Sequence, residues 1–375
     1  MRILVVGNGW SPDQAGGLNR YVSNLTKAID ELGVDQTVLV LGPAETTPSA
    51  GLRVVGATSQ PLPVRLQGFR REIKKRVAPA DVVVAHFALN VLPLFLRRGP
   101  RPPMVVHFHG PWAAESRAMR EARPVVALKK RVERFVYRRA TKLVTLSTAF
   151  RDILVNDYGI VPAKISVVGP GVDARGFRPR SGSSTDGAGT SRRKVLCVRR
   201  LVPRMGIDVL LEAWAHAGIT GSDLVIVGDG SDGPKLRALA RRLGISDRVR
   251  FAGHLPDDEL QLLYAEAFLS VVPSLELEGF GLVALESLAS GTPVVASRTG
   301  GLGELLADFA PQLLVTPGDV AELAKVLQDC LDGRAVLPSS ARCTGYAEQF
   351  SWDAVGTALI ELYADAARAR TATRA

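Results

Sequence analysis

The chain has 375 residues, of which 46% are hydrophobic and 22% are charged. This composition is typical of a soluble globular protein and excludes a mainly disordered chain, while the length favours two domains over one. Three cysteines cannot all pair, and the sequence has no C-x-x-C motif or Cys/His cluster. A disulfide scaffold and a structural zinc site are therefore not expected.

The first residues do not form a signal peptide, because MRILVV offers too few apolar residues before Gly7. The most apolar stretch, residues 82–96, contains polar residues and is shorter than the ~20 residues that a membrane span needs. We therefore expect a cytoplasmic protein, with peripheral contact to the inner membrane face as the open alternative.

Charge is distributed unevenly along the chain. Residues 1–180 hold 28 Lys/Arg and 13 Asp/Glu, a net charge of +15, whereas residues 181–375 carry −5. Two dense basic runs, at 65–76 and 129–142, predict a surface that attracts phosphorylated molecules or an acidic membrane, with a plain solvated helix face as the alternative. Nucleic acid is not an expected partner, because few aromatic residues interleave with these runs and no nucleic-acid-binding motif is present.

Short apolar segments alternate with helical periods throughout the first half. We expect strands at residues 2–6, 37–41, 81–85, 104–107 and 143–146, and the first helix at 19–32. Continuous apolar runs of this kind are typical of parallel strands that are covered on both faces. The alternation predicts the α/β class with doubly wound sheets.

A change of composition divides the chain. Residues 180–194 are rich in Gly, Ser and Thr and predict a linker, after which a second alternating series begins at 195. The sequence therefore predicts one Rossmann-like domain at 1–179, a second at 195–351, and a final helical segment at 352–375.

A dehydrogenase site is disfavoured by the first glycine-rich turn. Gly7 and Gly9 match two glycines of G-x-G-x-x-G, but Pro12 stands at the third, and strand 37–41 ends without the acidic residue that holds a ribose. Walker A, G-x-S-x-G, H-E-x-x-H and Asp-x-Asp motifs are also absent, so neither a metal nor another cofactor is expected.

Anion-binding features remain in the first half. Gly16 and Gly17 stand just before a helix, where backbone can approach a phosphate and helix N–H groups are free. His107 and His109 close a strand at the edge where doubly wound sheets bind ligands. A plain loop and two structural histidines are the alternatives.

The second half has a sharper signal. Arg199 and Arg200 close the strand that begins at 195, and Glu278-Gly-Phe-Gly-Leu opens an apolar helix. If that helix starts near Phe280, the N–H groups of residues 280–282 form an anion site.

Glu286 lies further along the same helix. The neighbouring Val283, Leu285 and Leu288 indicate that the helix is largely buried, and a buried carboxylate is costly without a partner. Glu286 is therefore a candidate ligand contact rather than a solvated side chain.

Together these residues resemble the retaining family-four glycosyltransferases of the GT-B fold. The motifs that carry the resemblance are Gly16-Gly17, His109-Gly110, Gly171-Val-Asp173, Arg200-Leu201 with Gly206, Gly228-Asp-Gly230, Pro273-Ser274 leading to Glu278-x7-Glu286, Ala289-Ser-Gly-Thr-Pro-Val-Val295, and Gly300-Gly301 with Glu304. The resemblance implies two Rossmann-like domains that face a central cleft, and a C-terminal helix, begun at Trp352, that crosses back to the first domain.

The resemblance also implies how a nucleotide-sugar donor, with UDP or GDP as its nucleotide, is bound. Arg200 would hold the diphosphate, Glu278 and the amides of Phe280, Gly281 and Leu282 the sugar and phosphate, and Glu286 the ribose. Gly16 and Gly17 would approach the phosphate, and His109 would face the sugar near the reacting carbon. The reaction implied is metal-independent hexosyl transfer to an acceptor hydroxyl with retention of anomeric configuration, in glycan or glycoconjugate biosynthesis.

One position departs from the family pattern. Where the family commonly has Lys-Gly as a second phosphate contact, this chain has Met205 and Gly206. We expect Met205 to belong to the donor site and to pack against the donor or the domain wall. Arg199 or Arg204 could supply the positive charge of the missing lysine.

Two other function classes stay open at this point. One is another GT-B enzyme, a sugar phosphorylase or a nucleotide-sugar epimerase, and the other is a non-catalytic nucleotide-sugar-binding protein. The basic first domain predicts an acceptor that is anionic or membrane-associated, whereas the donor sugar and the acceptor's identity are not readable from the sequence.

Overall fold

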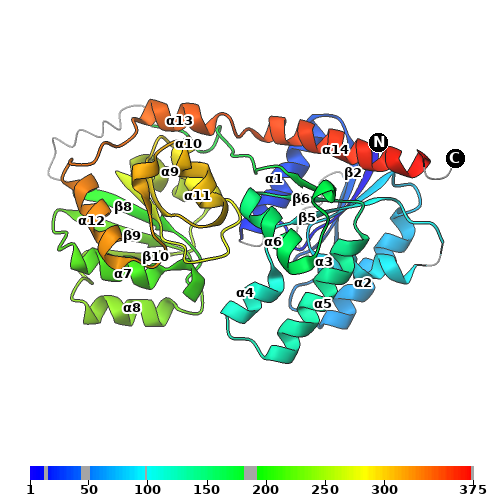
Figure 1. Cartoon of the computed structure of the whole chain (residues 1–375), viewed down its shortest axis with the longest axis horizontal. Helices are drawn as coiled ribbons and strands as arrows, with labels where there is room; N and C mark the ends of the chain where they lie inside the picture. Colours follow the sequence, from blue (N-terminus) through cyan, green and yellow to red (C-terminus); the bar gives the residue numbers. More distant parts are fainter. Residues whose placement is uncertain (12–15, 44–50, 98, 181–191, 373–375) are drawn as a thin grey trace. The chain divides into compact units, whose positions relative to one another are not determined.

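A computed structural model describes residues 1–11, 16–43, 51–97, 99–180 and 192–372, which form two compact units (Figure 1). The first unit comprises Met1–Gly171 together with Trp352–Ala375, and the second comprises Val172–Ser351. Each unit is a parallel sheet covered by helices, which confirms the predicted fold class of two Rossmann-like domains with a C-terminal helix on the first.

The first unit is built on a seven-stranded parallel sheet of order β3-β2-β1-β4-β5-β6-β7. Its strands are β1 (Arg2–Val6), β2 (Asp35–Leu41), β3 (Leu52–Gly56), β4 (Val82–Ala85), β5 (Met104–Phe108), β6 (Lys142–Thr145) and β7 (Ile165–Val167). The apolar side chains of β1, β4 and β5 are almost fully buried, as expected for strands that are covered on both faces.

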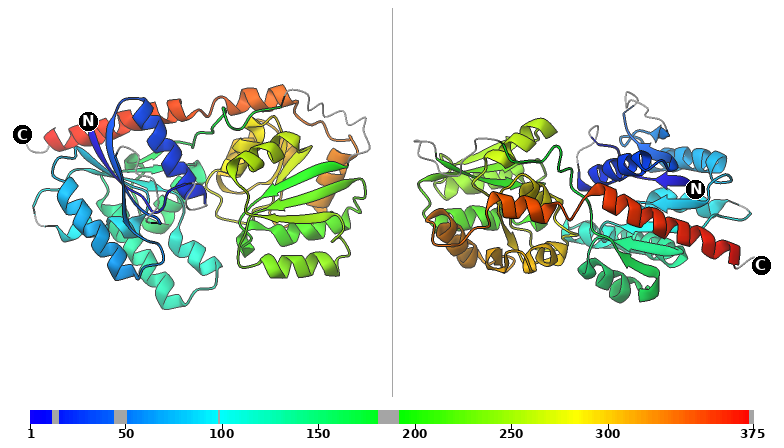
Figure 2. Two further views of the ribbon diagram at one scale, coloured as in Figure 1. Left: turned by 180° about the vertical axis from the view of Figure 1, so that it is seen from behind. Right: turned by 90° about the horizontal axis from the view of Figure 1, so that it is seen from above.

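Helices cover both faces of this sheet (Figure 2). They are α1 (Gly17–Glu31), α2 (Leu62–Arg76), α3 (Ala88–Val91) with the 3-10 turn η1 (Leu92–Leu96), α4 (Trp112–Ala118), α5 (Arg123–Arg139), α6 (Thr148–Tyr158), the 3-10 turn η2 (Pro162–Lys164) and α14 (Trp352–Ala372). The helices α2, α3, α5 and α6 share one apolar core with the strands, while α14 packs against α1 and strands β4 and β5. The last helix of the chain is therefore an integral layer of the first unit.

The second unit has a six-stranded parallel sheet of order β10-β9-β8-β11-β12-β13. Its strands are β8 (Arg193–Val198), β9 (Ser222–Val227), β10 (Val249–Gly253), β11 (Leu269–Val272), β12 (Val294–Ser297) and β13 (Leu314–Val315). Its helices are η3 (Pro203–Met205), α7 (Ile207–His216), α8 (Gly233–Arg242), α9 (Asp257–Glu266), α10 (Leu282–Ala289), α11 (Gly300–Ala307), η4 (Pro311–Leu313), α12 (Val320–Leu331) and α13 (Ser340–Ala347).

The strand orders define where each sheet binds ligands. Strand order reverses between β1 and β4 in the first unit and between β8 and β11 in the second. In doubly wound sheets the ligand crevice lies outside the carboxyl ends of the strands at such a reversal. Gly7 and His86 follow the two strands in the first unit, and Arg199 and Pro273 follow them in the second.

The first unit ends at Gly171, not at residue 179 as the composition predicted. The reason is local packing: the Val172 N–H donates to the Phe350 carbonyl at 2.8 Å, and the Phe177 ring stands edge-on to Tyr264 at 5.8 Å. Both partners belong to the second unit.

The predicted linker at 180–194 falls mostly on residues 181–191, which lie outside the described residues. Its last two positions, Arg193 and Lys194, are not linker, because they begin strand β8 and pair with β9. The first helix also starts earlier than predicted, at Gly17 rather than residue 19.

Cys197, Cys330 and Cys343 are all buried free thiols, which agrees with the expectation of no disulfide scaffold. Burial raises the pKa of the Cys197 thiol to about 12. Among the described helices, none is both long and apolar enough to cross a membrane.

We predict that Leu359→Ala lowers the free energy of unfolding of the first unit by about 2–5 kcal/mol, because Leu359 of α14 is fully buried. Glu361→Ala, on the exposed side of the same helix, is the matched control and should change stability by less than about 0.5 kcal/mol. Urea unfolding followed by circular dichroism measures both. Equal, small effects would mean that α14 does not stabilise this unit.

Candidate functional site

A buried ion pair lies at the strand reversal of the second unit. Arg199 follows β8, Glu278 lies in the segment after β11, and each is only 9% exposed. The Arg199 guanidinium donates through Nη2 to Glu278 Oε2 and also to Ser274 Oγ. Ser274 in turn donates to Glu278 Oε2 at 3.0 Å. One carboxylate oxygen is thus held by two donors from two neighbouring strand ends.

The charges at this point keep Glu278 ionised. Burial by itself raises the pKa of Glu278, but the Arg199 charge, the hydrogen bonds from Arg199 and Ser274, and the more distant Arg204 together hold its pKa below the ordinary value. A carboxylate that stays charged while buried requires its partners, so the three side chains form one structural unit.

Glycines let the surrounding backbone come close to this pair. A Cβ on Gly228, which has φ +125°, would lie 2.1 Å from the Arg199 carbonyl oxygen. A Cβ on Gly300, with φ +51°, would lie 2.0 Å from the Glu278 carbonyl oxygen, and the Gly301 N–H donates to the same oxygen at 3.0 Å. Neither position has room for a side chain, so both arginine and glutamate are fixed through their own backbones.

The segment that leads to Glu278 is also fixed by Arg204. The Leu275 N–H donates to the Arg204 carbonyl at 2.9 Å, and the Arg204 guanidinium donates to the Leu277 carbonyl at 3.1 Å. Leu277 has φ +55°, a left-handed conformation that is uncommon for residues other than glycine and persists only where the surrounding structure holds it. Arg204 therefore contacts the loop backbone, and the sequence had offered it only as a replacement for the missing lysine.

Arg200 is not part of the ion pair between Arg199 and Glu278. Its side chain is exposed and makes no hydrogen bond or ion pair within the described residues, although it neighbours Arg199 in sequence. Met205 is buried at 5% exposure, and its N–H donates to Val202. The structure thus brings Arg199 and Glu278 together, and leaves Arg200 as a cation without a protein partner in the described chain.

Helix α10 starts two residues later than the sequence predicted. Gly281 has φ +94° and caps the helix, and Leu282 is its first residue, because the left-handed glycine interrupts the helical path. The first helical hydrogen bonds are donated by Ala284 and Leu285 to the Gly281 carbonyl. The helix end that offers N–H groups is therefore at Leu282 and Val283, while Phe280 and Gly281 belong to the preceding loop.

Glu286 lies within α10 and is 4% exposed. Tyr264 of α9 donates to its Oε2 at 3.4 Å. The Glu286 carboxylate is buried as predicted. Tyr264 is one of its partners, and the sequence analysis did not identify it.

In the first unit, Gly16 caps the start of α1 with φ +138°, and Gly17 is the first helical residue. Among the described residues, nothing lies within 4 Å of a Cβ added to Gly16. The Gly9 N–H donates to Asn19 Oδ1 of α1 at 3.0 Å, which ties the segment after β1 to this helix.

Three histidines meet at the carboxyl ends of β4 and β5. His86 Nδ1 and His109 Nε2 share a hydrogen bond of 3.0 Å, and the ring centroids of His86 and His107 are 4.4 Å apart. His107 lies between two tyrosine hydroxyls: Tyr363 of α14 at 2.6 Å from Nε2, and Tyr21 of α1 at 3.4 Å from Nδ1. The sequence had singled out His107 and His109, but not His86 or either tyrosine.

The histidine cluster is neutral. Burial, with a smaller contribution from neighbouring histidines, lowers the pKa of His86 and His107 well below the ordinary value, and burial lowers the pKa of His109 to about 3. One nitrogen of each ring lies within 4.8 Å of the others, a spacing that a metal ion could span. Here, however, His86 and His109 bond directly and both His107 nitrogens face hydroxyls, so the arrangement is a hydrogen-bonded cluster rather than a preformed ligand set.

Glu133 of α5 is a further functional candidate that the sequence analysis missed. It is fully buried and accepts hydrogen bonds from the Trp112 N–H at 2.8 Å, the Ala113 N–H at 3.2 Å, Tyr158 at 2.8 Å and Tyr137 at 3.2 Å. Burial raises the pKa of this carboxyl. Glu133 fixes the start of α4, three residues after His109, and no local motif marks it.

Two doubly wound parallel sheets, each covered by helices, are the architecture of the GT-B class. Two family models match: "Glycosyltransferase Family 4" over residues 15–175 and "Glycosyl transferases group 1" over residues 185–350. A D-inositol 3-phosphate glycosyltransferase from Acidothermus cellulolyticus is 34% identical over 96% of this chain and 88% of its own. A glycogen synthase from Mycobacterium tuberculosis is 30% identical over 98% and 95%. The chain belongs to the family-four, group 1 glycosyltransferases and is a glycosyltransferase.

Solved structures share the fold. Sucrose-phosphate synthase from Thermosynechococcus elongatus superposes with a TM-score of 0.80 at 23% identity, covering 97% of this chain and 98% of its own. Anabaena HepE, in complex with UDP and glucose, gives a TM-score of 0.77 at 22% identity over 97% of this chain and 100% of its own.

We predict that Gly300→Ala lowers the free energy of unfolding of the second unit by more than about 1 kcal/mol, because its Cβ would collide with the Glu278 carbonyl at a positive φ. Gly345→Ala is the control: it is exposed in α13, its Cβ would meet nothing within 4 Å, and it should stabilise by about 0.5–1 kcal/mol. Chemical denaturation of both variants gives the comparison. Similar effects at the two glycines would show that the close approach is not a constraint.

Proposed function

We propose that the protein transfers a hexosyl group from a nucleoside-diphosphate sugar to an acceptor hydroxyl, with retention of anomeric configuration and without a metal ion. The observation that supports this most is the Glu278 carboxylate at the second unit's strand reversal, held charged and oriented by Arg199 and Ser274. The residue that follows Arg199, Arg200, is an exposed cation with no partner among the described residues. A nucleotide sugar needs both kinds of side chain: a carboxylate that accepts hydrogen bonds from sugar hydroxyls, and a cation that binds the diphosphate.

In this proposal the leaving group is stabilised by fixed positive charge. The bond from the anomeric carbon to the phosphate breaks through an oxocarbenium-like transition state, so negative charge develops on the diphosphate. Arg200 and the N-terminus of α10 at Leu282 supply cationic and dipolar partners for that charge. Because Arg199 neutralises Glu278, it is not available to the phosphate.

The remaining donor contacts follow the same proposal. Glu286 binds the ribose hydroxyls and Met205 contributes only apolar packing. In the first unit, Gly16 and Gly17 form the start of α1, a backbone position that suits a phosphate, and His109 contacts the sugar near the reacting carbon. In retention by front-face attack, the leaving phosphate takes the acceptor's proton, so the neutral His109 acts through a hydrogen bond rather than as a general base.

We predict that Arg200→Ala and Arg199→Ala fail in different ways. Arg200→Ala should remove most donor-dependent transfer while leaving the melting temperature unchanged, because its side chain is exposed and unpaired in the described chain. Arg199→Ala should destabilise the second unit by about 3–5 kcal/mol, because it leaves the Glu278 carboxylate buried and unpaired. Scanning calorimetry and a transfer assay with labelled donor distinguish them. A well-folded Arg200→Ala with normal turnover would contradict the site assignment.

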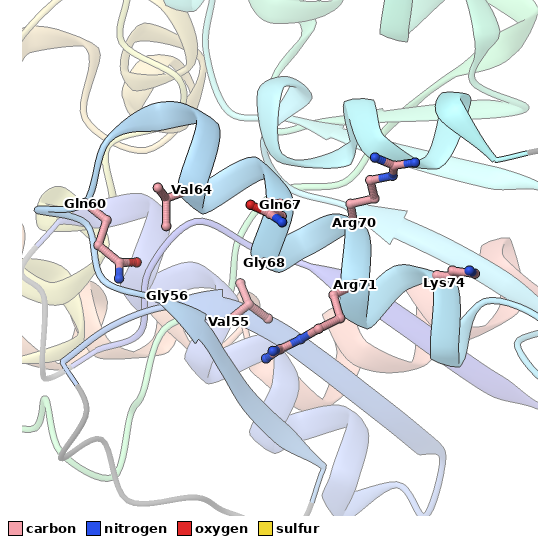
Figure 3. A pocket seen from close by; sticks show the side chains of 9 residues that line it. All are labelled: Val55, Gly56, Gln60, Val64, Gln67, Gly68, Arg70, Arg71 and Lys74. Carbon is pink, nitrogen blue, oxygen red and sulfur yellow. The ribbon is translucent and has the colours of Figure 1, made fainter.

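The acceptor is proposed to be anionic. Helix α2 presents exposed Arg70, Arg71 and Lys74 beside a hollow of about 470 Å³ (Figure 3), whose other lining residues include Gln60 and Val64. Arg70 and Arg71 leave the helix on different sides, and neither Arg70 nor Lys74 has an ion-pair partner among the described residues. The hollow combines cations, amides and apolar side chains, a lining that suits a phosphorylated or lipid-linked molecule.

A second helix of the same unit also exposes basic side chains. Helix α5 exposes Lys130, Arg131 and Arg134 together with the apolar Leu128, which is 61% exposed. Mixed basic and apolar surface is typical of proteins that contact acidic membranes, so a membrane-borne acceptor is the version we favour. The two relatives do not suggest a single acceptor, since one is a D-inositol 3-phosphate glycosyltransferase and the other a glycogen synthase.

We predict that the protein floats with vesicles containing an acidic phospholipid at low salt, and that the pair Arg70→Glu and Lys74→Glu weakens this binding by at least about tenfold. The matched control is Arg241→Glu with Arg242→Glu, an equal charge change on exposed α8 of the second unit, which should retain binding. If the unmodified protein ignores acidic and neutral vesicles alike, the membrane-borne version is wrong and a phosphorylated acceptor in solution remains.

A further inference from the structure

The three histidines at the carboxyl ends of β4 and β5 differ in how much of each ring is available. His86 and His107 are both 3% exposed, whereas His109 is only half-buried. His107 has a hydroxyl partner at each nitrogen, and His109 has His86 at Nε2. Two nitrogens of the cluster, His86 Nε2 and His109 Nδ1, make no hydrogen bond within the described residues. Only His109 lies on a half-buried ring, so its Nδ1 is the nitrogen that a ligand can reach.

The hydrogen bond between His86 Nδ1 and His109 Nε2 has two forms, because each neutral imidazole carries one proton. If His109 donates, His86 must carry its own proton on Nε2, and this N–H, on a ring that is only 3% exposed, has no hydrogen-bond partner among the described residues. If His86 donates, the N–H without a partner is instead that of His109 Nδ1, on a half-buried ring that water can reach. An unpaired N–H costs less where water can reach it, so the second form is favoured.

We propose that His86 is a positioning residue, which donates from Nδ1 to His109 Nε2 and thereby fixes His109 as the tautomer that carries its proton on Nδ1. His109 then presents an N–H donor, and not a lone pair, on its accessible side. A sugar hydroxyl or a phosphate oxygen accepts such a bond, whereas the other tautomer would only offer an acceptor. The inference rests on the proposed function only for the identity of this ligand.

The supports of His86 are rigid. Its own N–H donates to the Val6 carbonyl at 2.9 Å, within the continuation of the β1–β4 pairing. Its ring lies against His107, which Tyr363 anchors from α14. The His109 ring is thus held by His86, which the sheet and the His107 ring fix in turn, and Tyr363 of the last helix anchors His107.

The test is nitrogen-15 NMR of histidine-labelled protein without substrates, since long-range proton–nitrogen correlations distinguish the two neutral tautomers. The five histidines are assigned by the loss of signals in single variants, with the exposed His216 and His254 as references. We expect the signature of a proton on Nδ1 for His109. A proton on Nε2 in the unmodified protein would overturn the proposal.

Two variants of His86 separate positioning from packing. His86→Leu removes the donor, so His109 should change to the Nε2-protonated form or to a mixture, and turnover should fall by about tenfold to a hundredfold with the donor KM little changed. His86→Asn places an amide nitrogen where Nδ1 stood and should restore both the tautomer and most of the turnover. An unchanged His109 tautomer in folded His86→Leu would overturn the proposal, and if that variant does not fold, the unmodified protein's spectrum decides. Since the spectra need no donor or acceptor, absence of transfer would refute the proposed function and leave the tautomer result standing.

Discussion

The buried pair of Arg199 and Glu278 is the interaction on which the second unit's site depends. Two charges taken out of water are costly, and they are tolerated only when each satisfies the other and further hydrogen bonds complete the shell. Ser274 completes it here, and the pair joins the end of β8 to the segment after β11 across the strand reversal. One consequence is a difference between adjacent arginines: Arg199 is bound in the ion pair, whereas Arg200 is exposed and has no ion-pair partner among the described residues.

Close backbone approach is the second constraint. Gly206, Gly228 and Gly300 all have positive φ, and a Cβ at any of them would come within about 2 Å of a carbonyl oxygen. These oxygens belong to Pro273, Arg199 and Glu278, which are the residues at or next to the site. The glycines of the family motifs therefore have a structural reason: they allow three turns to press on the segments that carry the charged pair, which fixes the pair without any side chain.

Alternation of strands and helices was enough to predict two doubly wound sheets. The residue pattern marked Arg199, His109 and Glu278 as site candidates, but it assigned the diphosphate to Arg200. The sequence could not say which of two adjacent arginines points inward, because a strand end gives alternation but not the face. It placed the start of α10 wrongly, since the left-handed conformation of Gly281 is set by the loop around it.

Contacts between residues far apart in the chain could not be predicted either, because no local sequence pattern marks them. Tyr363 and His107 are 256 residues apart in the chain, and Glu133 reaches α4 through hydrogen bonds that follow no local pattern. Strand β3 was missed because it is short and three of its five residues are exposed or partly exposed, so its apolar period is weak. What the sequence lacked was therefore mainly the identity of contacts between elements, and not the elements themselves.

The central claim, a nucleoside-diphosphate sugar as the donor, is tested most directly by thermal denaturation of the protein with UDP-, GDP-, ADP- and dTDP-sugars. A ligand that binds only the native state raises stability by RT ln(1 + [L]/Kd), so the true donor should raise the melting temperature in proportion to the logarithm of its concentration. The account predicts such a shift for one nucleotide class and its loss in Glu286→Ala, where the ribose contact is removed. No shift with any nucleotide sugar at millimolar concentration, in protein that unfolds cooperatively, would contradict it.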